Sequence, residues 1–199
     1  MIYLDNNATT PITKRAVNAI TKWLSQPVNA STTTSDAKQA QKMMRDFTHL
    51  LQRKLGGASC ATIFTSGASE SNSTVLQSIT RSFWYLKKKK PHVIISNVEH
   101  SSIVDCALKM EEIGEIDLSC VEADVHGRVH AERVTPLIKE NTCLVAIMHA
   151  NNEIGTVNDI QKIGRVCKKH NVAFHCDATQ TVGKLPINIK TSNITSLAA

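Results

Sequence analysis

The chain alternates short apolar runs with amphipathic helical patterns, and this alternation restricts the fold more than any other feature of the sequence. Apolar runs bounded by polar residues predict strands, and a 3.6-residue apolar period predicts helices. The expected strands are residues 62–64, 93–95, 116–118, 144–148, 172–174 and the chain end at 196–199, and the expected helices are 35–55, 69–86, 103–112, 131–139 and a segment that starts after Asn158. Such alternation is typical of an α/β fold, a mostly parallel sheet with helices on both faces, which binds ligands at the carboxyl ends of its strands.

Length and composition indicate an ordinary globular protein. The 199 residues are 42% hydrophobic and 20% charged, which excludes a disordered or low-complexity chain. We expect an N-terminal arm at residues 1–30 that leads into one large domain at 31–199. No apolar run reaches the roughly 18 residues of a membrane helix, and the N-terminus lacks the regions of a secretory signal. These features predict an intracellular, cytoplasmic protein with no membrane partner.

The cysteines and the net charge exclude two further classes of protein. None of the six cysteines forms a C-x-x-C pair, which disfavours a zinc knuckle or a dithiol redox motif and fits a reducing compartment. The net charge is +6, and its densest patch is the lysine run 87–90. We interpret this run as a solvated helix end, because only 4% of the residues are aromatic and none alternate with the lysines to stack on bases. The sequence therefore predicts no nucleic-acid partner.

Four polar segments each follow an expected strand, where an α/β sheet places its site. They are residues 65–72, 99–102, 149–156 and 175–180. In the first, Gly67 allows a close backbone approach and Ser69 can cap the next helix, so free N–H groups there can bind a phosphate. In the last, the two-residue period of a strand places His175 and Asp177 on the same face.

The residues alone leave three kinds of site open. A planar phosphorylated cofactor would place its phosphate at residues 67–69 and a ring nitrogen at Asp177. A zinc or iron site has suitable ligand types but no H-x-x-x-H or H-x-E spacing. A Ser/His/Asp hydrolase lacks the G-x-S-x-G elbow. The side chains available to a metal are His100, His149, Glu153, His175 and Asp177.

Six motifs taken together, in this order, resemble the cysteine desulfurase and selenocysteine lyase family. These NifS-like proteins are pyridoxal-phosphate (PLP) enzymes of the class-V aminotransferase group. The motifs are residues 3–11, 65–72, 99–100, 151–156, 177–180 and 183–187. The resemblance implies the PLP fold-type-I large domain, C-terminally incomplete. In the family the Schiff-base lysine follows shortly after the Asp-x-x-Gln strand, so the chain is expected to be truncated before that lysine.

The resemblance also implies roles around the cofactor ring. His100 would stack on the pyridine ring and take part in proton transfer, which makes it the expected catalytic residue. Asp177 would pair with the pyridine nitrogen and keep it protonated, so that the ring accepts electrons in carbanion chemistry. Gln180 would hydrogen-bond the phenolic oxygen, and Asn152 would contact the same oxygen or the substrate. No metal is expected.

The phosphate group would bind at the start of the following helix. By resemblance, Ala68 and Ser69 would hold it through backbone N–H and hydroxyl groups. Ser69 stands where the family usually has Thr, and Ala198 aligns with a phosphate-binding Ser.

The activity implied is sulfur transfer from L-cysteine, or from selenocysteine, with release of alanine. A homodimer and a sulfur-acceptor protein are the expected partners. We expect no turnover by the 199-residue chain alone, because the family's lysine, persulfide cysteine and substrate-binding arginine find no match in it. The alternatives are a non-catalytic truncated paralogue or partner subunit and, with less support, a metal-dependent hydrolase.

Overall fold

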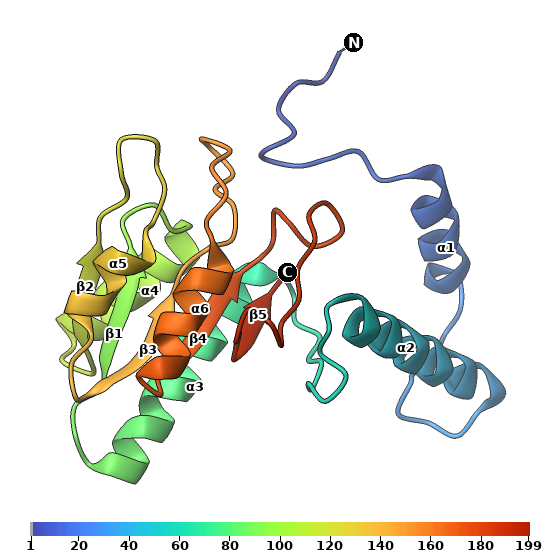
Figure 1. Ribbon diagram of the computed structural model, residues 1–199. Coiled ribbons are helices and arrows are strands. Elements are labelled where there is room, and N and C mark those ends of the chain that lie inside the picture. Colours follow the sequence, from blue (N-terminus) through green and yellow to red (C-terminus); the bar gives the residue numbers. More distant parts are fainter. Residues whose placement is uncertain (1) are drawn as a thin grey trace. The chain divides into compact units, whose positions relative to one another are not determined.

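The computed structural model describes residues 2–199 (Figure 1). The chain forms two compact units, one built from residues up to Lys54 together with 58–62, the other from 55–57 and 63–199. The first unit contains α1 (Lys14–Leu24) and α2 (Ser35–Lys54). The helix expected at 35–55 is thus confirmed, and it groups with the N-terminal segment. The arm at 1–30 as a separate region stays a prediction.

The second unit alternates helices and strands as the sequence predicts. Its elements are α3 (Ala68–Lys87), β1 (His92–Ser96), α4 (Ser101–Glu112), β2 (Asp117–Val121), α5 (Ala131–Val134), the 3₁₀ turn η1 (Thr135–Leu137), β3 (Thr142–Ala146), α6 (Ile160–Lys169), β4 (Ala173–Asp177) and β5 (Ser196–Ala198). The segment expected as one helix at 131–139 is split, because Pro136 falls at its second turn and removes a backbone donor. None of the helices in residues 2–199 is both long and apolar enough to span a membrane.

All pairings in the five-stranded sheet are parallel, in the order β2-β1-β3-β4-β5. The α/β class is therefore confirmed. β2 lies on one side of β1, and the next strand in the chain, β3, lies on the other side of β1. The direction in which successive strands are added therefore reverses between β1 and β3. Ligands of open α/β sheets bind beyond the carboxyl ends of the strands at such a reversal.

The strand expected at residues 62–64 is wrong. These residues form no strand, and Ile63 and Phe64 are 79% and 51% exposed. A three-residue apolar run becomes a strand only where a neighbouring strand offers a backbone ladder, and here the sheet begins at His92 instead.

Helices cover both faces of the sheet, with α3 and α4 on one face and α5 and α6 on the other (Figure 1). Alternate residues of β1 supply the two cores: Val93 faces the first pair of helices, and Ile94 faces the second. Burying a side chain of this size stabilises the fold by roughly 1.5–3 kcal/mol. Both faces of β1 and β3 are buried along their full length, so the only surface left for a ligand on these strands is at their ends.

Candidate functional site

The carboxyl edge of the sheet gathers the segments that the sequence singled out. His100 follows β1, residues 149–156 follow β3, and Asp177 ends β4. The first turn of α3 comes to the same edge, because Asn72 donates a hydrogen bond to Asp177. His175 and Asp177 both contact Asn72, which confirms that they share one face of β4.

The N-terminus of α3 is open to an anion. Gly67 precedes the helix and makes no side-chain cap, so the first N–H groups of a 20-residue helix keep their positive end exposed. The expectation that Ser69 caps the helix is wrong, because Ser69 is the second helical residue and is exposed. Its hydroxyl and the N–H groups of Ala68 and Ser69 lie at this end, where phosphate binds readily.

The turn before α3 is held by its own side chains. Thr65 Oγ1 donates to the Gly67 carbonyl at 3.0 Å and lies 2.8 Å from Ser71 Oγ. Glu70 Oε2 accepts from the Ser66 N–H at 2.6 Å, and the Ser66 side chain and then its backbone N–H lower the pKa of Glu70 by hydrogen bonding. The Ser66 N–H is therefore occupied, and the helix N–H groups that follow Gly67 are the ones available to a phosphate.

Asp177 is the best-defined carboxylate of the edge. It is only 5% exposed. Its Oδ2 accepts from Asn72 Nδ2 at 2.8 Å, and its Oδ1 accepts from the Thr179 N–H at 3.0 Å and from Thr179 Oγ1 at 2.6 Å. An ionised carboxylate has about four acceptor positions, so three are filled and one is left for a further donor. This fits a protonated pyridine nitrogen.

His100 caps α4 and presents an exposed imidazole. Its Nδ1 accepts from the Ser102 N–H at 3.1 Å, and Ser102 Oγ lies 2.9 Å from the same atom. These contacts fix the ring at the helix start while its outer face remains exposed, as stacking on a planar ligand requires.

Asn152 and Gln180 make only local contacts with their neighbours in the described part of the chain. Asn152 Nδ2 donates to Glu153 Oε1 at 2.8 Å, and Gln180 Oε1 accepts from Lys184 Nζ at 3.4 Å. Both side chains are partly buried. Their predicted roles at the cofactor oxygen therefore stay predictions.

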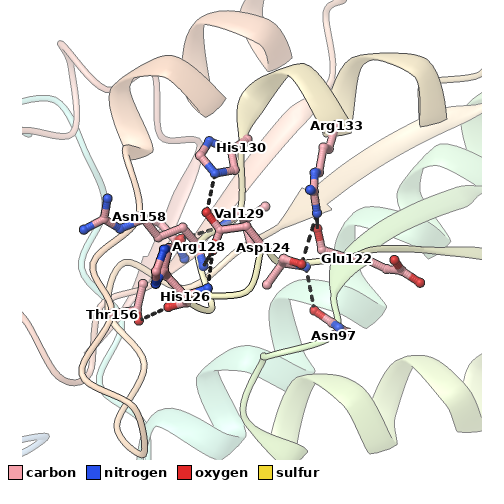
Figure 2. A network of polar contacts seen from close by, with 11 residues as sticks. Asn97, Glu122, Asp124, His126, Arg128, Val129, His130, Arg133, Thr156 and Asn158 are labelled. Carbon is pink, nitrogen blue, oxygen red and sulfur yellow. Dashed lines mark hydrogen bonds and ion pairs between the residues drawn. The ribbon is translucent and has the colours of Figure 1, made fainter.

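The loop that carries Asn152 is braced by the loop that follows β2 (Figure 2). Thr156 Oγ1 donates to the His126 carbonyl at 2.7 Å, and Asn158 Oδ1 accepts from the Val129 N–H at 2.9 Å. Gly127 has a φ of +75°, and a Cβ there would lie 2.1 Å from the Ile154 side chain. The close approach of the two loops restricts where Asn152 can lie.

The bracing loop is organised around Asp124 (Figure 2). Asp124 Oδ1 accepts from the N–H groups of His126 and Arg128 at 2.8 and 2.9 Å, and Oδ2 lies 2.7 Å from His130 Nε2. The His130 contact is the main reason that the pKa of Asp124 is well below its usual range. Arg133 closes the base of the loop by donating to the Glu122 and Ala123 carbonyls, both at 3.0 Å.

A buried acid lies directly before His100. Glu99 Oε1 accepts from Ser96 Oγ and from the Met148 N–H, while Oε2 has no partner among residues 2–199. Burial raises the pKa of Glu99 to about 8. Glu99 is therefore a neutral acid near pH 7 and adds no second negative charge beside Asp177.

The histidines proposed as metal ligands are used in other ways. His175 bonds Asn72 and Ser196, and His149 Nδ1 lies 3.0 Å from Thr181 Oγ1. Burial lowers the pKa of both rings. No three His, Cys, Asp or Glu side chains in residues 2–199 come together as a metal site.

Sequence reasoning missed Asn72 and Ser102. Both lie inside segments that were singled out, but neither received a role. The available signal was an asparagine inside a predicted helix, three residues after Ser69, where its helix propensity is low. That signal does not name its partners.

Comparison with known proteins places the chain in a family. The family model described as Aminotransferase class-V matches residues 2–199. Cysteine desulfurase IscS of Histophilus somni (strain 2336) is 37% identical over 192 residues, which are 94% of this chain and 46% of the relative. The mitochondrial cysteine desulfurase of Eremothecium gossypii is 34% identical over 206 residues, covering 99% of this chain and 40% of the relative.

Solved structures agree with the sequence relatives. One described as a NifS-like protein superimposes with a TM-score of 0.90 at 28% identity and covers 99% of this chain and 54% of its own. SspA in complex with cysteine gives a TM-score of 0.88 at 32% identity, with 98% and 56% coverage. The chain spans about half the length of the curated relatives it matches. It belongs to the class-V aminotransferase family, whose members depend on PLP, and it is homologous to the NifS-like cysteine desulfurases in that family.

Proposed function

We propose that these residues form the PLP-binding face of a cysteine desulfurase, an enzyme that moves sulfur from L-cysteine to an acceptor and releases alanine. The observation that carries the proposal is the buried Asp177 carboxylate, which keeps one acceptor position free at the end of β4. The uncapped N-terminus of α3 lies at the same edge and offers the phosphate site. One edge therefore carries an acceptor for a pyridinium and donors for a phosphate.

Each proposed contact uses a group described above. Asp177 would accept the pyridine N–H, and the first N–H groups of α3, at Ala68 and Ser69, would hold the phosphate with the Ser69 hydroxyl. His100 would stack on the ring and move a proton at its Nε2. When bound, PLP supplies an electron sink for carbanion chemistry at the substrate α-carbon. Gln180 and Asn152 would meet the phenolic oxygen.

Cofactor binding is the first test of the proposal. Equilibrium dialysis of the purified chain with PLP is expected to show saturable binding. Asp177→Asn should weaken it about tenfold or more, because a hydrogen bond between two charges is lost. Asp46→Asn on α2 is the matched control, since Asp46 forms its ion pair with an exposed lysine. Absence of binding, or equal binding by Asp177→Asn, would refute the proposed site.

Turnover is a separate test. We propose that the 199-residue chain does not release alanine from L-cysteine, because no lysine of this chain matches the family's Schiff-base lysine. Lys184, the lysine nearest to Asp177 in sequence, belongs to the 183–187 motif and contacts Gln180. Alanine and sulfide are measured after incubation with PLP and L-cysteine, and sustained alanine release would overturn this part of the proposal.

We also propose a homodimer and a protein sulfur acceptor, as the family resemblance implies. Sedimentation equilibrium with and without PLP measures the mass of the particle directly. A monomer at all concentrations up to about 100 µM would contradict the proposed homodimer, since a stable dimer has a dissociation constant far below that value.

A further inference from the structure

Asn72 forms hydrogen bonds with three residues from two other elements, β4 and α4. It lies on α3 and is fully buried. Its Nδ2 donates to Asp177 Oδ2 at 2.8 Å and to Ser102 Oγ at 3.0 Å, and its Oδ1 lies 2.9 Å from His175 Nε2. An asparagine amide has two donor hydrogens, so both are used, and each serves a different part of the candidate site.

One assignment of donors and acceptors gives Asn72, Asp177 and His175 a partner for each hydrogen bond on the β4 side. An ionised Asp177 only accepts, so Asn72 presents its NH₂ to Asp177 and its carbonyl to His175. His175 Nε2 therefore carries a hydrogen, and Nδ1 accepts from Ser196 Oγ at 3.0 Å. Burial lowers the pKa of His175 to about 4, so the ring is neutral at pH 7 and has only this one N–H.

The same assignment of donors and acceptors extends to His100. Ser102 Oγ accepts from Asn72, so its own hydrogen goes to His100 Nδ1 at 2.9 Å. In the neutral His100 ring the hydrogen is therefore on Nε2, the nitrogen away from the helix start. The bonds of Asn72 thus orient the Asp177 carboxylate and, through the Ser102 hydroxyl, add a second donor to His100 Nδ1, which also accepts from the Ser102 N–H.

We infer that Asn72 and His175 are positioning residues of the PLP site: His175 locks the amide of Asn72, and Asn72 orients Asp177 and, through Ser102, His100. The inference rests on the proposed function, because it concerns how this chain prepares Asp177 and His100 for the cofactor. It gives a specific role to His175, which the sequence analysis listed among the side chains available to a metal.

Variants of the full chain distinguish the loss of a hydrogen-bond donor from the loss of side-chain volume. Asn72→Asp keeps the shape but cannot donate to Asp177, and Asn72→Ala removes the group. His175→Phe fills the space without a donor, and His175→Gln restores an N–H. Thr80→Val is the matched control, since Thr80 is a buried hydrogen-bonding residue of α3 outside this chain of bonds.

Binding and spectra of PLP are measured by equilibrium dialysis and absorbance on variants shown to be folded. Asn72→Asp, Asn72→Ala and His175→Phe are expected to weaken PLP binding about tenfold or more and to shift the absorption band of the bound ring. His175→Gln should recover to within about threefold of the unmodified chain, and Thr80→Val should match it. The band reports the surroundings of the bound ring, and a loss of chain stability alone would not move it in a variant that is folded and saturated with PLP.

Nuclear magnetic resonance of the unmodified chain tests the bond direction without any variant. The ¹⁵N shifts of His175 are expected to show a neutral ring with hydrogen on Nε2, and an Nδ1–H tautomer would overturn the inference even if every variant misfolds. If the chain binds PLP and Asp177→Asn abolishes binding while folded Asn72→Asp binds normally, only the inference fails. If the unmodified chain binds no PLP, the proposed function fails and the inference with it.

Discussion

Glu99 Oε1 and the N–H of Met148 meet at 3.0 Å in the interior of the second unit, which joins the end of β1 to the end of β3. Residues 49 positions apart are thereby linked at the reversal of strand order, directly before His100. The carboxyl group has no cation partner in the described residues, and burial is the main cause of its raised pKa.

The Glu99 carboxyl group predicts a loss of stability toward alkaline pH. The folded-state pKa is about 8 against 4.5 for the free group, so the folded chain holds a proton that the unfolded chain has lost between these values. The free energy of unfolding should fall by roughly 3–5 kcal/mol as pH rises through this window. Urea unfolding from pH 5 to 8 measures the slope, and Glu99→Gln should remove it. An equal slope in that variant would contradict the assignment.

His175 predicts the opposite slope on the acidic side. Its folded-state pKa is lowered from 6.5 to about 4, chiefly by burial, so the unfolded chain binds more protons between these values. The stability contribution is complete above pH 6.5 and is lost as pH falls toward 4, by about 3 kcal/mol. A proton titration of the ring by nuclear magnetic resonance checks this prediction. Titration of His175 near 6.5 would refute it.

At Gly164 of α6, replacing glycine by alanine is expected to lower the stability of the protein rather than raise it. Alanine normally stabilises a helix interior by about 1 kcal/mol relative to glycine. Here a Cβ would lie 1.8 Å from the Ser192 carbonyl oxygen, so α6 or the 188–194 turn must move. Gly164→Ala should therefore lower the free energy of unfolding by about 2 kcal/mol or more. Gly67→Ala is the control, since nothing lies within 4 Å of its Cβ position, and it should change stability by less than about 0.5 kcal/mol.

The hydrogen bonds of Asn158 predict how much the contact between the two loops contributes to the free energy of unfolding. Its side chain accepts from the Val129 N–H and donates to the Met148 carbonyl, both at 2.9 Å, and it is 4% exposed. Asn158→Ala leaves two buried backbone groups unsatisfied and should cost about 2–4 kcal/mol. Hydrogen exchange should show the Val129 amide losing its protection.

Thr156→Val provides the comparison, because it removes only the more exposed bond to the His126 carbonyl and should cost less than about 1 kcal/mol. Similar losses in Asn158→Ala and Thr156→Val would show that the buried amide does not hold the two loops together.

The strands at the centre of the sheet were predictable because their apolar pattern identifies them without knowledge of their neighbours. Both faces of β1 and β3 are buried, so each reads as a continuous apolar run. The run at 62–64 is just as apolar, but no neighbouring strand pairs with it, and sequence alone does not show which runs find partners. The predicted cap at Ser69 is also wrong, because the helix begins one residue earlier, at Ala68, after an extended Gly67.

Asp177 and His100 could be nominated from sequence because each follows an apolar run, and strand ends share one edge of a parallel sheet. The sequence by itself therefore determined the α/β class, the edge on which the site lies, and the residues offered there. Only the tertiary structure decided that Asn72 bonds Asp177 and His175, from which it is separated by 105 and 103 positions. The physical reason is that a hydrogen bond needs its two atoms placed to within a few tenths of an ångström. That placement depends on how α3 packs against β4, which no local pattern encodes.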